Sequence, residues 1–353
     1  MLLYFLVLIW LLMTIVDIYN LKNRPNELCK VDNKKILNIL VLIPARGKDL
    51  SIKMNFKKAI KYIGKRNLLV LVDSKKDYAY KLAKDLGMRI LLVKGRCSKC
   101  SGKTRAIIYA LKKYNNYDAY IILDSDVSIT KNWLNSLISN LNCRGYGAST
   151  TFPIFKPIKN NFWSYAKEVW GLVGISLVEN EKTRFGWGGS LAFKREIIDK
   201  KLFYYLSKSK YALSDDISIT KRVKDKNMKI AYSKDIAYVY TKENFSSFFE
   251  WSNRQTFFTL LGSNKMFYFG IAYYSAEIIL ILLGGIFIIY NPIFIFFYSH
   301  LIKSIIVGYK RIKKINFKII VAFIIMPFIY LINLIIAKNK KEIFWRGRKY
   351  VVE

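Results

Sequence analysis

Histidine is almost absent from this sequence of 353 residues, which contains a single one, His300. That residue lies in an apolar stretch near the C-terminus, so the polar middle of the chain has no imidazole to act as an acid, a base or a metal ligand. An aspartate is therefore the natural general base for any reaction that this part of the chain catalyses.

Cysteine is scarce as well, with four residues, of which Cys97 and Cys100 form a C-x-x-C pair. A tetrahedral zinc site would need two more ligands, and only Cys29 and Cys143 are soft enough to serve. We therefore expect ordinary free thiols in a reducing compartment rather than a zinc or redox centre.

Acidic residues are also few, because 24 Asp and Glu stand against 59 Lys and Arg and leave a net charge of +35. The hydrophobic fraction is nevertheless 53%. The two features coexist because the apolar residues are segregated into a few long segments. No nucleic-acid-binding module accompanies the basic charge, so we expect no nucleic acid partner. The positive charge of the lysines instead favours binding to anionic lipids and to a polyanionic substrate.

The first apolar segment covers residues 1–20 and carries no charge before Asp17. A signal peptide would have basic residues ahead of the apolar run and a small-residue cleavage site after it, and neither is visible. The segment therefore predicts an uncleaved membrane anchor. Basic residues follow it and place the next domain in the cytoplasm, at the cell membrane; they are Lys22, Arg24 and Lys30.

Residues 267–337 contain the other apolar segments, and residues 338–353 form a basic tail. The segments span residues 267–290, 293–308 and 317–337. Three full crossings would put the basic tail outside, against the positive-inside rule. We therefore expect an even number of crossings here, with either the middle segment or the one broken by Pro327 re-entrant or lying on the surface.

Between these segments, residues 36–242 alternate apolar strands with amphipathic helices. The expected strands cover residues 36–43, 68–72, 89–93 and the run ending at Asp124. The expected helices cover residues 51–62, 77–86 and 103–113. Such alternation predicts an α/β domain with a mostly parallel sheet wound from βαβ units.

The stretch Ala119–Val127 carries the strongest chemical signal, because an apolar strand runs directly into Asp124 and Asp126. In an extended segment, residues two apart point the same way and can hold one hard divalent cation. A polar turn at the end of a strand is the alternative explanation.

Other polar residues also follow strands or begin helices at the same predicted edge, where open α/β sheets bind ligands. Pro44 ends the first strand, and Asp73 follows the second, where it can bind a nucleotide base or simply cap a helix. Gly102 and Lys103 open the next helix, and a helix N-terminus with a lysine favours phosphate.

Two further motifs lie downstream. Gly188, Gly189 and Ser190 follow two aromatic residues, so this segment is either a platform for a sugar or lipid head or a tight turn with buried rings. Asp215 and Asp216 follow Ser214, a plausible N-cap. With Ser214 as the N-cap, both carboxylates complement the helix dipole. One of them could also accept a proton from the hydroxyl of an acceptor substrate.

Residues 243–266 contain an amphipathic helix rich in aromatic residues, which suits a membrane interface. Ser247 and Glu250 have the spacing of a capping box. Arg254 and Gln255 lie within this helix, where the arginine could bind a pyrophosphate or extend to lipid phosphates.

In this order and spacing, the motifs resemble those of the family 2 type of inverting glycosyltransferases, which have a GT-A fold. Within that group the chain is most similar to the membrane-bound ceramide glucosyltransferase branch. The similarity covers roughly residues 36–260, and the segment 344–350 also resembles a Trp-Arg-Gly-Arg-aromatic ending of that branch. The chain departs from the family pattern around Arg254, whose neighbours differ.

The resemblance implies a role for each matching position. Asp73 would contact the nucleotide base and Lys103 the phosphates, while Asp124 and Asp126 would bind the diphosphate through Mg²⁺ or Mn²⁺. Asp216 would be the catalytic base and Asp215 its support. The remaining residues would border the donor sugar or hold the leaving diphosphate; they are Pro44, Gly102, Gly188, Gly189, Ser190, Arg254 and Gln255.

The expected function is that of a multi-pass membrane glycosyltransferase with its catalytic domain on the cytoplasmic side. It would move a hexose from a UDP-sugar to a lipid hydroxyl with inversion. Two alternatives remain open: a membrane polysaccharide synthase, and a non-catalytic, membrane-tethered binding or scaffold protein.

Overall fold

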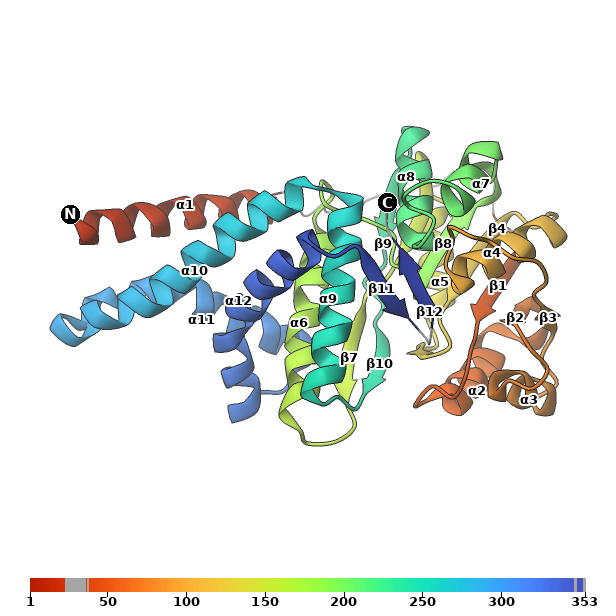
Figure 1. Ribbon diagram of the computed structural model, residues 1–353, viewed down its shortest axis with the longest axis horizontal. Coiled ribbons are helices and arrows are strands. Elements are labelled where there is room, and N and C mark those ends of the chain that lie inside the picture. Colours follow the sequence, from red (N-terminus) through yellow and green to blue (C-terminus); the bar gives the residue numbers. More distant parts are fainter. Residues whose placement is uncertain (23–35, 37, 346–347, 352–353) are drawn as a thin grey trace.

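The computed structural model describes residues 1–22, 36, 38–345 and 348–351 (Figure 1). Its centre is a seven-stranded sheet in the order β3–β2–β1–β4–β8–β6–β9. The strands are β3 (Ile90–Leu92), β2 (Leu68–Val72), β1 (Ile39–Pro44), β4 (Ala119–Leu123), β8 (Ser190–Lys194), β6 (Tyr146–Thr150) and β9 (Lys229–Tyr232). Strand β8 is antiparallel to both of its neighbours and the other pairs are parallel, so the prediction of a mostly parallel sheet is confirmed.

Helices cover both faces of this sheet because its central strands are apolar on both sides. Along β1, Val41 and Ile43 belong to one buried cluster, and Leu40 and Leu42 belong to the other. Helices α2 (Ile52–Ile63), α3 (Tyr78–Asp85) and α5 (Trp133–Leu141) pack on the first face. Helices α4 (Gly102–Lys113), α7 (Lys200–Ser207) and α8 (Asp215–Asp225) pack on the second. Short 3₁₀ turns occupy Lys65–Asn67 and Arg195–Ile197.

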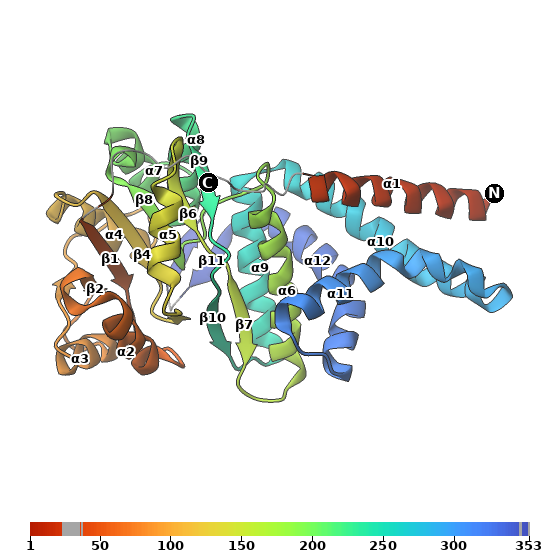
Figure 2. The ribbon, with the colours of Figure 1, turned by 180° about the vertical axis from the view of Figure 1, so that it is seen from behind.

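A second layer joins this domain to the apolar helices. It contains a small sheet of β5 (Val127–Ser128), β10 (Ala237–Thr241) and β7 (Pro153–Pro157). Helices α6 (Phe162–Glu179), α9 (Phe245–Gly262) and α12 (Phe317–Lys338) pack beside it, as Figure 2 shows from behind. One cluster unites the three helices through Trp170, Phe248 and Phe323.

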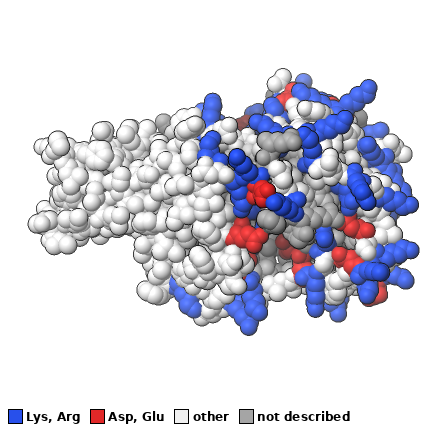
Figure 3. Space-filling model, in the orientation of Figure 1, with Lys and Arg blue, Asp and Glu red and all other residues white. Residues whose placement is uncertain are grey.

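Four helical segments of the described residues are long and apolar enough to cross a membrane. They are α1 (Leu2–Lys22), α10 (Lys265–Tyr290), the 3₁₀ segment η3 (Pro292–Tyr298) continued by α11 (Ser299–Ile312), and α12. Helices α1 and α10 extend side by side away from the domain, and Figure 3 shows their outer parts without charged residues on this face. Helix α12 differs, because 44% of its apolar window is buried inside the structure, against 11% for α1.

The charged residues of the middle apolar segment have partners. His300 Nδ1 lies 2.9 Å from Asp17 Oδ2, and Lys303 pairs with the same carboxylate. Nearby, Trp10 Nε1 donates a hydrogen bond of 2.8 Å to Ser299 Oγ. These contacts fix α11 against α1 and satisfy polar groups that would be costly among apolar helices.

The predicted elements agree closely with the observed ones where the apolar pattern is strong, but the predicted capping box of α9 is wrong. The cap is Asn244, whose side chain accepts from the Ser247 N–H at 2.8 Å, while Ser247 Oγ accepts from the Asn244 N–H at 3.0 Å. Ser247 already lies in the first turn of the helix, so Glu250 takes no part in the cap.

The basic tail folds back onto the α/β domain. Strands β11 (Glu342–Trp345) and β12 (Arg348–Val351) form an antiparallel hairpin that begins shortly after α12 ends. Part of the motif noted in the sequence, residues 346–347, lies outside the described residues, as do Arg24, Cys29 and Lys30 near the N-terminus.

Candidate active site

Five of the predicted donor-site residues gather around one pocket at the carboxyl ends of β1, β2 and β4. These five are Pro44, Asp73, Gly102, Lys103 and Asp124. Pro44 ends β1, Asp73 follows β2 and Asp124 follows β4, because parallel strands bring their carboxyl ends to one edge of the sheet.

Lys103 connects the two halves of the site. Its Nζ atom lies 2.9 Å from Asp124 Oδ1 and 3.3 Å from Asp215 Oδ1, and it donates a hydrogen bond of 3.0 Å to the Gly188 carbonyl. Burial opposes the charge of this lysine, but Asp124, Asp215 and Asp216 outweigh burial and hold the pKa of Lys103 well above its usual range. Lys103 is therefore a permanent cation among carboxylates.

Asp215 and Asp216 open helix α8 as predicted, and the Ser214 side chain caps this helix by accepting from the Ile217 N–H. Burial raises the pKa of Asp215 to about 7; Lys103 opposes the rise, and Asp216 and Asp124 add to it. Asp215 Oδ2 is buried without a hydrogen-bond partner among the described residues. This carboxyl thus changes its charge near neutral pH.

Asp216 is held differently from its neighbour. Its Oδ2 accepts from the Gly188 N–H at 3.2 Å, and its Oδ1 accepts from the Ile217 N–H at 2.8 Å and from the Ser214 hydroxyl. These donors fix the orientation of the carboxylate. It is also less buried than Asp215, so one side of it can meet a substrate.

The glycines at Gly188 and Gly189 are required by close packing. A Cβ atom at Gly188 would lie 2.9 Å from Asp215 Oδ2 and 3.0 Å from Lys103 Nζ, and one at Gly189 would lie 2.3 Å from the Trp187 ring. Ser190 begins β8, where its Oγ accepts a hydrogen bond of 2.8 Å from Trp133 Nε1 in the core. The glycine backbone therefore faces the site, while the serine side chain faces the interior.

Asp124 and Asp126 are separated by a turn and do not lie in an extended segment. The Val127 N–H donates to the Asp124 carbonyl at 3.0 Å, which closes the turn between β4 and β5. Among the described residues no group of three or more His, Cys, Asp and Glu side chains could hold a metal ion. Mg²⁺ and Mn²⁺ nevertheless suit this place, since one or two carboxylates and substrate phosphates are the usual ligands of such ions.

Arg254 and Gln255 lie on α9, with both side chains half-buried. Arg254 Nη1 is 4.0 Å from Glu250 Oε1 in the preceding turn. The structure thus assigns both residues to the helix layer and not to the pocket around Lys103.

Lys167 is a buried cation that sequence analysis missed. Its Nζ atom lies 2.7 Å from Glu243 Oε1 and 4.4 Å from the centre of the Trp251 ring. Burial lowers the pKa of Lys167, Glu243 and Asp126 oppose this shift, and Arg254 adds to it. Lys167 therefore lies within electrostatic range of both the Asp126 turn and Arg254. Its position in a long apolar helix gave no signal in the sequence.

Arg105 was missed as well, although it lies one turn from Gly102. Its guanidinium pairs with Asp73, and Nη1 donates a hydrogen bond of 2.7 Å to the Gly95 carbonyl. The arginine therefore fixes both the carboxylate expected to bind a base and the loop before α4.

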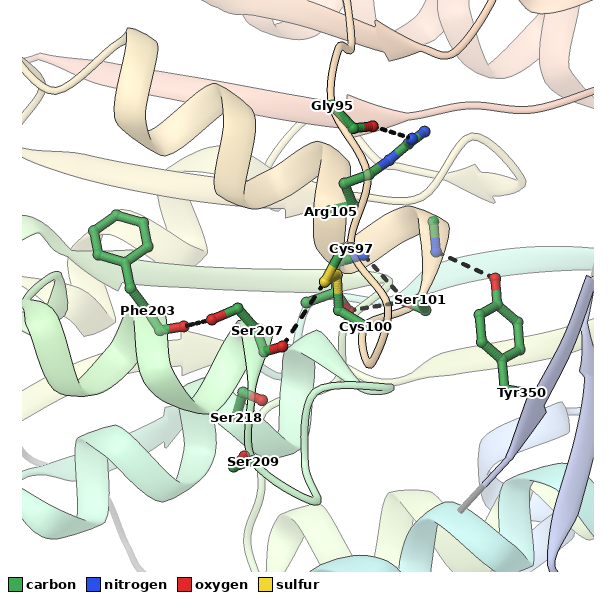
Figure 4. The surroundings of a disulfide bond; sticks show 12 residues. Gly95, Cys97, Cys100, Ser101, Arg105, Phe203, Ser207, Ser209, Ser218 and Tyr350 are labelled. Atoms are coloured by element: carbon green, nitrogen blue, oxygen red, sulfur yellow. Dashed lines mark hydrogen bonds between the residues drawn. A yellow bond between two sulfur atoms is a disulfide. The ribbon is translucent and has the colours of Figure 1, made fainter. Parts of the chain in front are cut away.

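That loop also contains a disulfide between Cys97 and Cys100 (Figure 4), and Cys143 is disulfide-bonded as well, so the prediction of free thiols is wrong for these three residues. Cys97 and Cys100 are close in sequence, and the loop between β3 and α4 brings them together directly before the N-cap Ser101. The Ser101 N–H donates to the Ala212 carbonyl at 3.4 Å, which links the loop to the segment ahead of α8.

The site combines the N-terminus of α4, where an anion can bind, with the buried Lys103. It also contains two pairs of carboxylates, one after β4 (Asp124 and Asp126) and one at the start of α8 (Asp215 and Asp216). Such a site can bind a polyanion through Gly102 and Lys103, and it can take up a proton at Asp216. The two functions meet at Lys103 and Gly188, which contact groups from both halves.

A solved structure of a known protein shares this fold. The mannosyltransferase PcManGT from Pyrobaculum calidifontis, in complex with GDP-Man and Mn²⁺, matches with a TM-score of 0.54 at 13% identity, over 94% of this chain and 97% of that one. Glucosyl-3-phosphoglycerate synthase from Mycobacterium tuberculosis, in complex with Mn²⁺ and uridine-diphosphate-glucose, matches with a TM-score of 0.43 at 16% identity, over 64% of this chain and 79% of that one.

A search of curated proteins finds no match to the sequence. The family described as Glycosyl transferase family 21, in contrast, matches residues 2–353. This agrees with the expected glycosyltransferase class and with the α/β fold built around the Lys103 site. Because the match covers nearly the whole chain, the chain belongs to glycosyl transferase family 21.

Proposed function

We propose that this glycosyltransferase moves a hexose from a nucleotide diphosphate sugar to a lipid hydroxyl, with inversion at the anomeric carbon. A UDP-hexose is the favoured donor, and the acceptor class is that of the ceramide glucosyltransferase branch. The observation that carries the proposal is the contact of Lys103 with both Asp124 and Asp215, which joins a phosphate-binding half to a carboxylate half.

In the proposed donor complex, Asp73 binds the base and the Gly102 N–H and Lys103 bind the diphosphate. Asp124 and Asp126 hold one Mg²⁺ or Mn²⁺. When bound, such an ion neutralises the charge that builds on the leaving diphosphate. The matched PcManGT structure contains GDP-Man and Mn²⁺, which supports a metal-assisted nucleotide sugar site of this kind.

In the proposed transfer step, Asp216 removes the proton of the acceptor hydroxyl while that oxygen attacks the anomeric carbon from the face opposite the diphosphate. The bond to the diphosphate oxygen breaks in the same step, so one displacement inverts the configuration. Asp215 remains paired with Lys103 during this step and keeps the lysine in place. Arg254 of α9 lies outside the pocket around Lys103 in the structure, and in this scheme it would reach the leaving diphosphate in the donor complex.

We also propose a membrane arrangement. Helices α1 and α10 and the η3–α11 segment cross the bilayer, whereas α12 lies at its cytoplasmic surface beside α6 and α9. This gives an even number of crossings after the catalytic domain, and it keeps the basic tail on the same side as that domain. The burial of α12 and the folding of the tail hairpin onto the domain support this arrangement.

The test is to incubate membranes that contain the protein with labelled UDP- and GDP-sugars and Mn²⁺, and to analyse the extracted lipid. We expect one labelled lipid of inverted configuration, and its loss in Asp216→Asn. Asp225→Asn at the other end of α8 is the matched control, because Asp225 pairs with Lys221 and Lys201 outside the site.

Each competing function predicts a different product. A polysaccharide synthase would release a polymer rather than a single labelled lipid. A binding or scaffold protein would show no metal-dependent hydrolysis of any donor. A product that retains the donor's configuration would contradict the single displacement.

A further inference from the structure

Among the described residues that line the donor pocket, Tyr350 alone comes from outside the segment 44–125. It lies on β12, opposite Ile343 of β11. Ile343 is buried in an apolar cluster with residues from three other parts of the chain, and Tyr350 packs against this cluster. The other buried members are Leu213, Phe257, Leu260, Leu334 and Ala337. The hairpin is thus anchored by packing, with Tyr350 directed into the pocket.

The hydroxyl of Tyr350 occupies the start of helix α4. The Gly102 N–H donates to Tyr350 Oη at 3.2 Å, and Figure 4 shows the tyrosine reaching this backbone group from the hairpin. Ser101, the N-cap, accepts from the Thr104 N–H instead. The first amide of α4 therefore has a neutral hydroxyl as its acceptor at the place where a diphosphate oxygen would bind.

The pocket is small in this conformation. Its volume is about 70 Å³, whereas sites for small molecules usually measure roughly 300–1,000 Å³. Tyr350 lines this pocket together with residues at the carboxyl ends of β1, β2 and β4. Movement of the tyrosine away from Gly102 would enlarge the pocket and free the Gly102 N–H for a nucleoside diphosphate.

We propose that Tyr350 gates the donor site, its hydroxyl holding the Gly102 amide until the diphosphate of the donor replaces it. The inference rests on the proposed function, since it takes a nucleoside diphosphate as the ligand. Tyr350 acts by competing for one hydrogen-bond donor and has no part in the chemical step.

The packing of the hairpin also connects this exchange of acceptors at Gly102 to the proposed catalytic base, Asp216. Leu213, in the same cluster as Ile343, lies two residues before Asp215 and one before the N-cap Ser214. Release of Tyr350 relaxes the cluster next to the start of α8. Donor binding and the placement of the carboxylate pair are therefore coupled through the hairpin.

The test measures binding to the full-length protein in detergent by calorimetry, with UDP and GDP in the presence of Mn²⁺ and with uridine and guanosine. Tyr350→Phe removes only the hydroxyl and frees the Gly102 amide. We expect about two- to tenfold tighter binding of the preferred diphosphate, the range set by one hydrogen bond. Binding of the nucleoside should be unchanged, since it has no phosphate.

Tyr204→Phe is the matched control, because Tyr204 is an exposed tyrosine on α7 outside the pocket, and it should bind like the wild type. Weaker or equal binding of the diphosphate by Tyr350→Phe would overturn the gate. A wild-type protein that binds neither diphosphate would instead refute the proposed function itself.

A second measurement needs no variant. Hydrogen–deuterium exchange of residues 338–345 in the wild-type protein should become faster when UDP or GDP with Mn²⁺ binds, because the hairpin loses its contact with α4. Slower or unchanged exchange in this segment, with nucleotide bound, would show that Tyr350 is a fixed part of the wall and would overturn the proposal.

Discussion

Lys103 and Asp215 form an ion pair of 3.3 Å in which the two side chains are only 13% and 5% exposed. The same lysine binds Asp124 at 2.9 Å. Removing one member of such a buried pair leaves an uncompensated charge, which typically costs about 3–5 kcal/mol. The pair therefore supports both the stability of the site and its capacity to bind anions.

Lys103→Met tests this dual role. We expect a loss of unfolding free energy of about 3 kcal/mol, together with loss of nucleotide diphosphate binding. The double variant Lys103→Met/Asp215→Asn should recover much of the stability, since the buried charge is gone, but none of the binding. Thermal unfolding and calorimetry measure the two effects. Full nucleotide binding by Lys103→Met would contradict its assignment to the donor site.

Gly188→Ala tests the close packing between the glycine segment and the carboxylates. The added methyl would meet Asp215 Oδ2 and Lys103 Nζ within about 3 Å and displace them. A misplacement of this size in an active site costs about a hundredfold in rate. Gly262→Ala at the end of α9 is the control, because its Cβ would meet only an Ile217 methyl at 4.0 Å. The initial rates of sugar transfer should be measured for both variants. Equal rates would contradict the assignment of Gly188 to the active site.

Asp73→Asn tests base recognition. Asp73 is held by Arg105, which also binds the Gly95 carbonyl, so its carboxylate is fixed at the pocket wall. We expect about tenfold weaker binding of the preferred nucleoside diphosphate, the loss typical of a hydrogen bond to a charged group. Binding of inorganic diphosphate with Mn²⁺ should be unaffected. If both ligands weaken equally, Asp73 supports the phosphate site and not the base site.

Glu168 gives the stability of the protein a pH dependence. Burial raises its pKa from an ordinary 4.5 to about 7, while Lys314 and Lys156 oppose the rise, and Oε2 has no hydrogen-bond partner among the described residues. The folded protein thus binds this proton more tightly than the unfolded chain does, so stability from this group falls as the pH rises from about 4.5 to about 7.

Glu168→Gln removes that dependence. At pH 8 we expect the variant to be more stable than the wild type by up to about 3 kcal/mol, and at pH 4.5 the two should unfold at similar temperatures. The exposed carboxylate of Glu196 provides the control variant Glu196→Gln, with no such pH-dependent difference. A Glu168→Gln advantage that persists at low pH would mean that the gain comes from packing.

Sequence patterns predicted the parts of the fold that depend on local order. Residues 68–72 are apolar throughout and bounded by a polar residue at each end, and they form β2 with these same bounds. Ser214 was recognised as a cap because capping depends on neighbouring residues only. The edge of the sheet where Pro44, Asp73 and Asp124 meet followed from the parallel topology.

Contacts between distant segments were beyond such patterns. The pairing of Arg105 with Asp73 joins a helix to a strand end, and Tyr350 reaches Gly102 from 248 positions away. The tail was expected only as a basic segment on the cytoplasmic side, and its sequence did not predict that two of its strands form a hairpin with Tyr350 lining the pocket. The composition of these segments does not specify their partners, because distant segments come into contact only once the whole chain has folded.

The C-terminal end of α6 is tied to the apolar helices from two directions. Glu179 pairs with Arg311 of α11 at 2.5 Å, and the side chain of Asn180 donates a hydrogen bond of 3.1 Å to Asn20 of α1. Gly188 follows eight residues after Asn180. In the proposed membrane orientation, these ties set the height of the reaction centre above the bilayer. The enzyme would then select acceptors by how far their hydroxyl projects from the membrane.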